Sequence, residues 1–305
     1  MPLPIAAIVN FCSNESRFLA ACLTEAQKFS RQVIVPVCDH FFDGTPENRM
    51  VLEQVYRAFP DCHFIEYPFI PSEIPRHIFQ DVAPAHFWHS CSRLVGASVL
   101  NDDIESVLFL DADEVAEGER MAEWLEASDY RQNMVLKLAN YWYFREPKYQ
   151  ALAWEDSIVL AQARALTPEL ILRQEERDAL YDELPGPKRR HTTGCDGQPM
   201  FHHYSWVRTK DEMLKKVSAW GHKADRDWKQ LVEQEFADGF RGVDFIHGYK
   251  YREIAPKFDI RLEAPVFSPI AKAPHVTRLT QKGLLDLLKF KKHGLWDWIS
   301  GLVQG

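Results

Sequence analysis

Two carboxylates, one residue apart, follow an apolar run near the middle of the chain. Residues 107–110 read Val-Leu-Phe-Leu, and Asp111 and Asp113 come next with one alanine between them. The run predicts a buried strand that ends in these two residues, and strand residues i and i+2 point to the same side. Two carboxylates leaving a sheet together suit a divalent cation that also binds phosphate oxygens. A solvated acidic turn after a core strand is the alternative.

Two more predicted strands end in polar residues. They are the strands at 5–10 and 33–38, and the three polar strand ends are Asn10 to Glu15, Asp39 to Thr45 and Asp111 to Glu114. Ligands of open parallel sheets bind beyond the carboxyl ends of the strands, so these residues are expected to converge. Asp39 or Asp43 could accept hydrogen bonds from a base or ribose. The alternative for both is plain turn chemistry, since Asp-Gly is a turn signal.

A parallel sheet must position these strand ends. Strands are predicted at 5–10, 33–38, 63–67 and 107–113, and helices at 16–29, 47–59, 90–100 and 119–127. Strands that alternate with helices predict a parallel α/β sheet with right-handed crossovers. Residues 135–144 and 157–163 predict an antiparallel pair. Residues 69–90 predict an irregular insertion, 173–200 a long loop, and 209–222 a helix capped by Thr209 with Glu212 three residues on.

Composition limits the partners and the compartment. The net charge of -8 and the pI of about 5.9 argue against nucleic acid as the main partner. The six cysteines have no metal-ligand spacing, which favours a reducing cytoplasm. We expect no secretory signal and no bilayer-spanning segment. Residues 280–303 predict an amphipathic helix, basic on its polar side, which packs on protein or makes peripheral contact with a membrane surface.

The Asp111-Ala-Asp113 sequence after an apolar strand resembles the DxD motif of GT-A-fold glycosyltransferases. Residues 33–47, which end Cys-Asp-His-Phe-Phe-Asp-Gly-Thr-Pro-Glu, resemble the segment that family-2-like members finish with an Asp and a DGT turn. Arg93 lies where these enzymes often carry a basic residue before the DxD strand. The resemblance covers roughly residues 5–160. It implies one GT-A-like, Rossmann-type α/β domain with a mostly parallel central sheet, a smaller antiparallel part and a C-terminal helical tail.

The resemblance also implies a site. The cation, Mn²⁺ or Mg²⁺, would be held by Asp111 and Asp113 with a histidine from the second half of the chain, His202 or His203, between which the sequence does not decide. Arg208, Lys210, Lys215 and Lys216 would add positive charge for a leaving diphosphate. The residues expected to bind the nucleotide-sugar donor are Asn10, Glu15, Asp39, Asp43, Arg93, Asp111, Arg208 and Lys210.

The remaining role is that of a base for the acceptor hydroxyl. An inverting transfer needs a carboxylate there, and Glu155 and Asp156 are the candidates, with Glu114 and Asp227 as weaker ones. The aromatic residues 141–144 could stack on a sugar. The alternative for Glu155 and Asp156 is a loop between two strands.

The sequence therefore predicts a metal-dependent glycosyltransferase with a UDP- or GDP-sugar donor and a glycan, lipid or protein acceptor. Residues 1–265 would form the transferase domain, with a nucleotide-binding half at 1–130 and an acceptor half at 131–265, and residues 266–305 a C-terminal amphipathic helical extension. One alternative is a haloacid-dehalogenase-type phosphatase, in which the first Asp of a DxD is the nucleophile. Another is a catalytically silent nucleotide- or sugar-binding protein.

Overall fold

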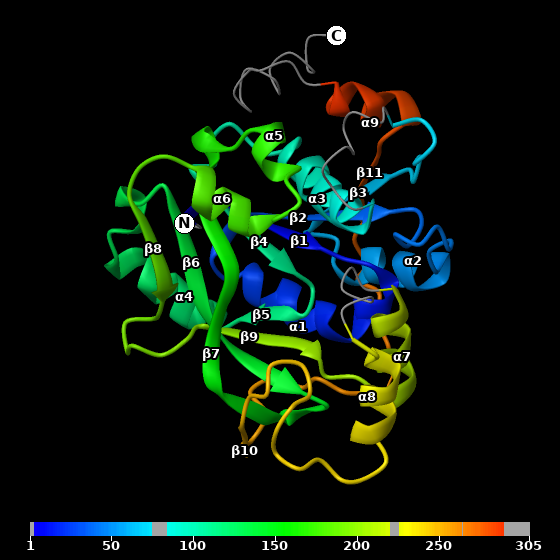
Figure 1. Ribbon diagram of the computed structural model, residues 1–305. Coiled ribbons are helices and arrows are strands. Elements are labelled where there is room, and N and C mark those ends of the chain that lie inside the picture. The colour runs from blue at the N-terminus through cyan, green and yellow to red at the C-terminus, as the bar shows by residue number, and fades with distance from the viewer. Residues whose placement is uncertain (1–2, 75–83, 220–225, 264, 290–305) are drawn as a thin grey trace.

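One large mixed sheet runs through the protein (Figure 1). The computed structural model describes residues 3–74, 84–219, 226–263 and 265–289. The strand order is β11-β3-β2-β1-β4-β7-β6-β9-β5, with β10 paired to β7 and β8 to β6. The strands are β1 (Leu3–Asn10), β2 (Ser30–Cys38), β3 (His63–Tyr67), β4 (Ser106–Asp111), β5 (Glu114–Ala116), β6 (Val135–Phe144), β7 (Glu146–Gln162), β8 (Lys188–Thr192), β9 (Phe201–Trp206), β10 (Tyr251–Glu253) and β11 (His275–Arg278).

Helices cover both faces of the sheet. The α-helices are α1 (Ser16–Ala26), α2 (Arg49–Ala58), α3 (Pro84–Ala97), α4 (Gly118–Ala127), α5 (Pro168–Ile171), α6 (Arg177–Glu183), α7 (Lys210–Ala219), α8 (Trp228–Glu235) and α9 (Gln281–Leu288). Residues of α1, α2 and α4 pack into one hydrophobic cluster, and residues of α3, α5, α6 and α9 into another. The expected α/β class is confirmed.

The parallel half of the sheet comprises β11, β3, β2, β1 and β4. Side chains of β1 alternate between the two clusters: Ile5 and Val9 face one, and Ile8 faces the other. The helix α3 packs very close to β1, because a Cβ added at Gly96 would lie 2.6 Å from Ile8. This close packing fixes the position of the residues that α3 places at the carboxyl end of the sheet.

The antiparallel part follows β4. The strand β7 runs antiparallel to both β4 and β6, as predicted for residues 135–163, and β9 joins β6 in parallel. A third hydrophobic cluster packs α7 and α8 against this part, with Trp206, Met213 and Trp228 buried in it. The helix α7 begins with the capping box predicted from Thr209 and Glu212, whose side chains bond each other's backbone N–H groups.

Several local predictions were wrong. The strand at 107–113 ends at Asp111, and β5 begins at 114 after a turn. Residues 173–200 contain α6 and β8 instead of one long loop. The helix predicted from residue 90 begins at Pro84, within the segment predicted to be irregular.

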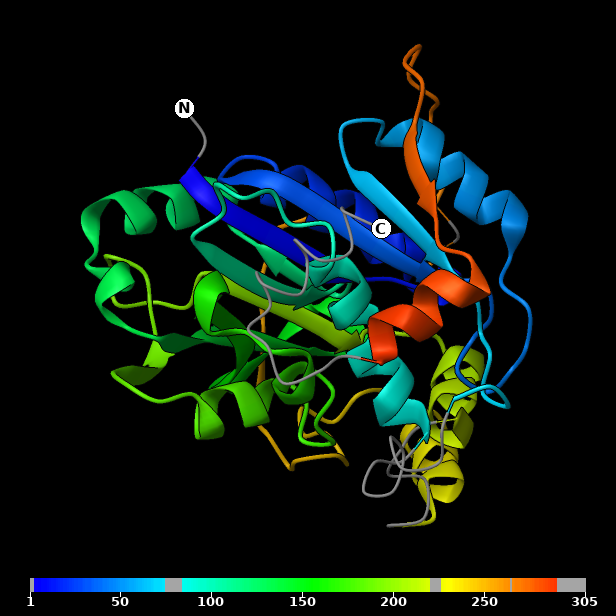
Figure 2. The same ribbon diagram turned by 90° about the horizontal axis from the view of Figure 1, so that it is seen from above.

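The C-terminal region adds a strand that the sequence did not predict. The strand β11 lies in the predicted extension and pairs in parallel with β3 (Figure 2, orange beside light blue). Part of the predicted tail helix is present as α9, with Leu284, Leu287 and Leu288 buried. Residues 75–83, 220–222 and 290–303, which also carried predictions, lie outside the described residues. Of the helices described, none has the length and apolar character needed to span a membrane.

Candidate active site

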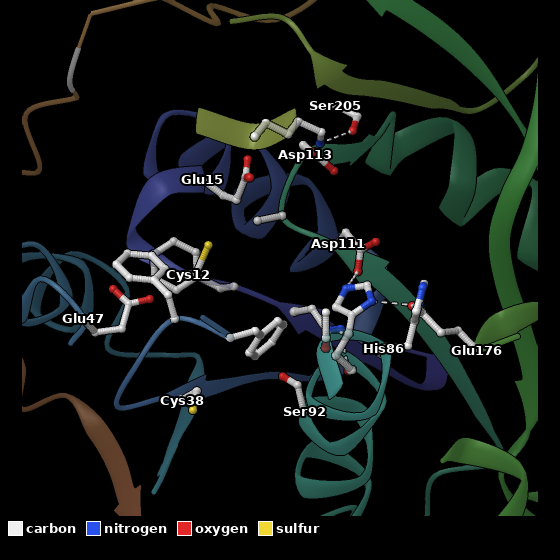
Figure 3. Close-up of a pocket in the computed structure, with 18 of the residues that line it drawn as sticks. Cys12, Glu15, Cys38, Glu47, His86, Ser92, Asp111, Asp113, Glu176 and Ser205 are labelled. Carbon is white, nitrogen blue, oxygen red and sulfur yellow. Dashed lines mark hydrogen bonds and ion pairs between the residues drawn. The ribbon is translucent and has the colours of Figure 1, made fainter. Parts of the chain in front are cut away.

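A cavity of about 390 Å³ lies at the carboxyl ends of β1, β2 and β4 (Figure 3). The three predicted polar strand ends do meet there, since Asn10, His40 and Asp111 all line it. In Figure 3, Cys12 and Glu47 lie on one side of the cavity and Asp111 with Glu176 on the other. The predicted convergence is therefore present, although not every predicted residue takes part.

The backbone turns sharply between the two aspartates. Asp111 is the last residue of β4 and pairs with Asn10 of β1, whereas Asp113 lies in the turn before β5. The turn is held by Glu114, whose Oε2 accepts a hydrogen bond from the N–H of Asp111 at 2.9 Å. The N–H of Tyr204 donates to the carbonyl of Asp113 at 2.8 Å. The same-side rule for a strand therefore does not apply to Asp111 and Asp113.

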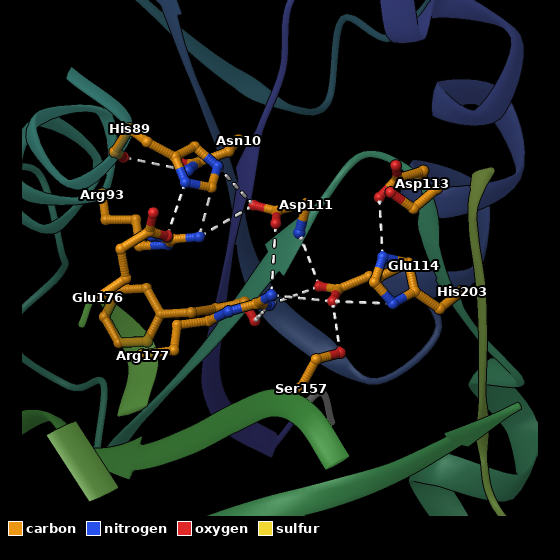
Figure 4. Close-up of polar contacts among 12 residues, drawn as sticks. Asn10, His89, Arg93, Asp111, Asp113, Glu114, Ser157, Glu176, Arg177 and His203 are labelled. Carbon is orange, nitrogen blue, oxygen red and sulfur yellow. Dashed lines mark hydrogen bonds and ion pairs between the residues drawn. The ribbon is translucent and has the colours of Figure 1, made fainter. Parts of the chain in front are cut away.

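Asp111 faces a group of cations (Figure 4). Its Oδ1 lies 3.1 Å from Nε2 of His89 and 3.1 Å from a guanidinium nitrogen of Arg93, and its Oδ2 lies 3.3 Å from Arg177. Burial raises the pKa of Asp111, but Arg177, His89 and Arg93 outweigh it and hold that pKa well below its usual range. Asp111 is therefore ionised and already neutralised by protein groups.

Glu176 completes this group from the start of α6. Its Oε2 lies 2.7 Å from Nδ1 of His89 and 2.6 Å from Arg93, and its Oε1 lies 2.9 Å from His86. Burial and Arg93 lower the pKa of His89, but Glu176 and Asp111 outweigh them and raise it to about 9. Glu176 has a φ of 53°, a conformation that costs a non-glycine residue free energy.

Asp113 faces the other way, toward His203 (Figure 4). Its Oδ1 lies 3.6 Å from Nε2 of His203, which is beyond hydrogen-bond distance. Within the described part of the chain, Oδ1 of Asp113 and Nδ1 of His203 are buried atoms with no hydrogen-bond partner. Burial, and then the charge of Glu15, raise the pKa of Asp113 to about 7. A buried carboxylate oxygen without a partner, such as Oδ1 of Asp113, suits a ligand, whereas Nδ1 of His203 faces Glu114, 3.9 Å from its Oε1.

The two adjacent histidines have different surroundings. His203 lines the cavity, whereas His202 points away from it and is held by the Tyr143 hydroxyl at 2.6 Å and by Glu117 at 3.1 Å. Burial lowers the pKa of both imidazoles. His202, which the sequence left as an equal candidate for the metal, is thus a core residue, because its two ring nitrogens are already satisfied.

The positive charge predicted near the cavity comes from two of the four basic residues. Lys216 lines the cavity and donates to the Ser205 hydroxyl at 2.7 Å. Arg208 lies next to it, 2.6 Å from Glu15 and 3.9 Å from Asp113. Burial and the charge of Arg208 lower the pKa of Lys216.

The other two predicted basic residues make their contacts away from the cavity lining. Lys210 pairs with Glu233 of α8 and does not line the cavity, so the structure does not bring it to the expected donor site. Lys215 donates to Asn14 at 3.3 Å. Arg93, also predicted to bind the donor, lies behind the cavity wall, where it contacts Asp111 and Glu176.

The predicted base- or ribose-binding aspartates do not line the cavity. Asp39 accepts a hydrogen bond from the N–H of Phe69 at 2.7 Å, and Asp43 accepts one from the N–H of Thr45 at 2.9 Å. Asp43 therefore acts in its own turn, as the alternative for it predicted, whereas Asp39 bonds the backbone of the segment that follows β3. The carboxylate that does line the cavity on this side is Glu47, which accepts hydrogen bonds from the N–H groups of Ser13 and Asn48.

The predicted bases, Glu155 and Asp156, line a second cavity of about 870 Å³. The two cavities share His86 and Glu176 in their walls. Asp156 is bound through both oxygens by Arg190, at 2.9 Å each, and Lys137 lies 3.5 Å away. Burial raises the pKa of Asp156, but Arg190 and Lys137 outweigh it and lower that pKa, which makes Asp156 a poor base.

Glu155 has the opposite character. Its carboxylate accepts a hydrogen bond from the Tyr249 hydroxyl at 3.1 Å, and His247 lies 3.8 Å away. Burial raises its pKa. Of the two predicted bases, Glu155 is the one whose environment suits proton transfer. The weaker candidates serve structure: Glu114 is fully buried against Arg177 and Ser157, and Asp227 caps α8.

A cation fits this site through Asp113 and His203. In the described residues, no group of three or more His, Cys, Asp or Glu side chains is arranged to hold a metal. Oδ1 of Asp113 and Nε2 of His203, which face each other at 3.6 Å, are nevertheless a carboxylate and imidazole pair that suits Mn²⁺, with other positions left to waters or phosphate oxygens. Asp111, predicted as the first metal ligand, has both oxygens occupied by protein cations.

Comparison with known proteins gives structural likenesses alone. No protein-family profile matches the chain, and no curated protein matches it. One similar solved structure is an active-site mutant of LgtC, at 10% identity and a TM-score of 0.37, covering 75% of this chain and 95% of that one. Another is the glycosyltransferase GlyE of Streptococcus pneumoniae TIGR4, at 11% identity and a TM-score of 0.37, covering 76% of this chain and 63% of that one. TM-scores this low do not bear on activity, so the function is argued from the site's own chemistry.

Proposed function

We propose that this protein is a glycosyltransferase that takes a sugar from a nucleotide-diphosphate donor with the help of Mn²⁺ or Mg²⁺. The observation that carries the proposal is that Asp113 Oδ1, a buried oxygen with no hydrogen-bond partner, faces Nε2 of His203 at 3.6 Å in the wall of a cavity at the carboxyl edge of a parallel sheet. Asp113 and His203 would hold the cation. When bound, the cation would offset the charge that develops on the departing diphosphate.

The chain's own residues supply the rest of the donor site. Lys216 presents an ammonium group to the cavity, and Arg208 holds Glu15 in place beside Asp113. Asp111 fixes the wall, because it ties β4 to α3 through His89 and Arg93. In this proposal Asp111 orients the site, and Asp113 binds the cation.

The acceptor would enter the second cavity. Glu155 lies there with a raised pKa, and this carboxylate would accept the proton of the acceptor hydroxyl. His86 and Glu176 line both cavities, so an acceptor bound in the second cavity would lie beside a donor bound in the first. Such adjacency is what direct transfer between two bound substrates needs.

The contacts of Asp111 argue against the phosphatase alternative. In that chemistry the first Asp of the DxD attacks phosphorus, which requires an oxygen free to approach it. Here Oδ1 of Asp111 is bound by His89 and Arg93, and Oδ2 by Arg177. A nucleophile held in this way would be both shielded and stabilised as the ground-state carboxylate.

Donor hydrolysis tests the proposal. Purified protein is incubated with a panel of UDP- and GDP-sugars, with manganese or with a chelator, and release of the nucleotide is measured. We expect release from one donor class that needs the cation and is lost in Asp113→Asn. The control Asp103→Asn removes an exposed carboxylate paired with Arg31 and should leave release unchanged. Absence of release from every donor favours the silent binder, and turnover of a generic phosphate ester favours the phosphatase.

A further inference from the structure

The second cavity has a strongly acidic wall. Six carboxylates line it, against two lysine or arginine side chains, among the residues that the structure describes. The acidic residues are Glu155, Asp156, Glu175, Glu176, Asp178 and Asp182, and the basic ones are Lys137 and Arg177. Arg190 and Arg93 neutralise Asp156 and Glu176 from outside the lining, which still leaves an excess of carboxylates. An anionic group placed among carboxylates in a half-enclosed site is repelled unless a cation neutralises it.

The two basic side chains already form ion pairs with carboxylates of the protein. Lys137 pairs with Asp178 and lies 3.5 Å from Asp156. Arg177 makes hydrogen bonds of 2.5 and 2.9 Å to Glu114. A phosphate or carboxylate on a ligand would have to compete for these cations. The pairs of Lys137 with Asp156 and of Arg177 with Glu114 are buried, and breaking a buried pair is costly.

The same wall carries an aromatic surface. Trp154 is 40% exposed, an unusual exposure for so large an apolar side chain, and it lines the cavity. The Tyr141 ring holds it edge to face at 6.3 Å. On the same wall, Tyr249 presents its hydroxyl to Glu155. An exposed aromatic face beside hydrogen-bonding carboxylates offers a sugar both an apolar ring contact and partners for its hydroxyls.

The first cavity also has an acidic lining, with five carboxylates and Lys216 among the described residues, but it offers ligands for a cation that could neutralise an anionic ligand. There Asp113 and His203 leave two buried atoms without partners, and Lys216 stands at the wall. No side chain lining the second cavity, among the described residues, leaves such a pair of orphaned metal-ligand atoms. With a cation bound, the first cavity would therefore suit an anionic ligand, whereas the second cavity suits a ligand without negative charge.

We infer that the second cavity binds a sugar that carries no negative charge, stacked on Trp154 with a hydroxyl toward Glu155. The inference rests on the proposed function in naming this sugar as the acceptor. It excludes sugar phosphates, phosphate-linked lipids and acidic sugars as the group that enters this cavity. A free or terminal hexose or hexosamine fits the charge of the wall.

Direct binding tests this without a donor. Saturation-transfer NMR is run with methyl glycosides of glucose, galactose, mannose and N-acetylglucosamine, and with the matching 6-phosphates. Three proteins are compared: the wild type, Trp154→Ala and Leu152→Ala. Leu152 is a matched control, since it is exposed on the same strand, two residues away, and does not line the cavity.

The expected result is that at least one neutral glycoside binds the wild type and Leu152→Ala, and that Trp154→Ala weakens it roughly tenfold. The matching 6-phosphate should bind at least tenfold more weakly than the neutral glycoside. Equal or tighter Trp154-dependent binding of the phosphates overturns the inference, as does failure of every neutral glycoside. Failure of the proposed function has a different signature, namely no nucleotide release from any donor while neutral glycosides still bind.

Discussion

Asp111 and Asp113 are separated by one residue, yet their carboxylates face different partners. Asp111 lies against His89, Arg93 and Arg177, whereas Asp113 lies 3.6 Å from His203 (Figure 4). The turn after β4 separates them, and the carboxylate of Glu114 holds that turn. One aspartate is thereby part of the framework, and the other is left for a ligand.

Replacing Asp111 should damage the fold. Asp111→Asn removes the negative charge that neutralises Arg93, Arg177 and His89. Leaving buried charges without a partner lowers the free energy of unfolding by about 3–5 kcal/mol. Urea unfolding followed by circular dichroism measures this change. Asp103→Asn, which removes an exposed partner of Arg31, should change the unfolding free energy by less than about 1 kcal/mol. Similar costs for both variants would show that Asp111 is not a framework residue.

Substitutions at Glu155 and Asp156 should have different effects, the first on activity and the second on stability. Glu155→Gln removes the proposed base and should lower kcat roughly 10²–10⁴-fold while the unfolding free energy stays near that of the wild type. Asp156→Asn deprives Arg190 and Lys137 of their carboxylate and should lower stability. Steady-state kinetics and urea unfolding of both variants check this. An unchanged kcat in Glu155→Gln would show that Glu155 does not act as the base.

The basic residues of α7 should differ in their effect on nucleotide binding. Lys216 lines the cavity, so Lys216→Gln should weaken the affinity for a nucleoside diphosphate roughly tenfold, or about 1.4 kcal/mol. Lys210→Gln is the matched control on the same helix, because Lys210 pairs with Glu233 away from the cavity. Calorimetric titration gives both affinities. Equal losses in the two variants would place the diphosphate elsewhere.

The contribution of His63, in the strand pair β3 and β11, to the stability of the fold should be lost in acid. The rings of His63 and His275 stack with centroids 3.8 Å apart, and burial, with the charge of His275, lowers the pKa of His63 to about 4 from its ordinary 6.5. The folded state therefore favours neutral His63. Its contribution is complete above about pH 6.5 and is lost as the pH falls toward 4.

The comparison of wild type with His63→Gln isolates that contribution. Unfolding free energies are measured by urea titration at several values between pH 7.5 and 4.5. The difference between the two proteins should shrink as the pH falls, because the wild type alone has to protonate His63 against its lowered pKa. A difference that does not change with pH would mean that this imidazole is not coupled to folding.

Much of the sheet could be predicted because its signal is local. Apolar runs such as 107–110 and the alternation of strands with helices are visible in the sequence, and they place the carboxyl ends of β1, β2 and β4 together. The chemistry of these ends was predicted for Asn10, Glu15 and the two aspartates for the same reason. Each of these four residues does line the cavity.

The contacts that divide the roles within the site could not be predicted. Glu176 and Arg177 lie in a segment without periodicity and reach residues 83 and 66 positions away. The turn after Asp111 depends on Glu114 bonding the backbone, which leaves no mark in the hydrophobic pattern. Alternation along β9 separates His202 from His203, but the face that meets the cavity is set by tertiary packing. Glu47 was overlooked although it closes the Asp-Gly-Thr segment.

The most direct test is calorimetric titration of the wild type and Asp113→Asn with UDP and GDP, each with and without manganese. The account predicts that one nucleotide binds the wild type, that manganese tightens this binding roughly tenfold or more, and that Asp113→Asn abolishes the manganese effect. The same variant should still unfold cooperatively. If neither nucleotide binds the wild type, or if manganese tightens binding equally in Asp113→Asn, the central claim is contradicted.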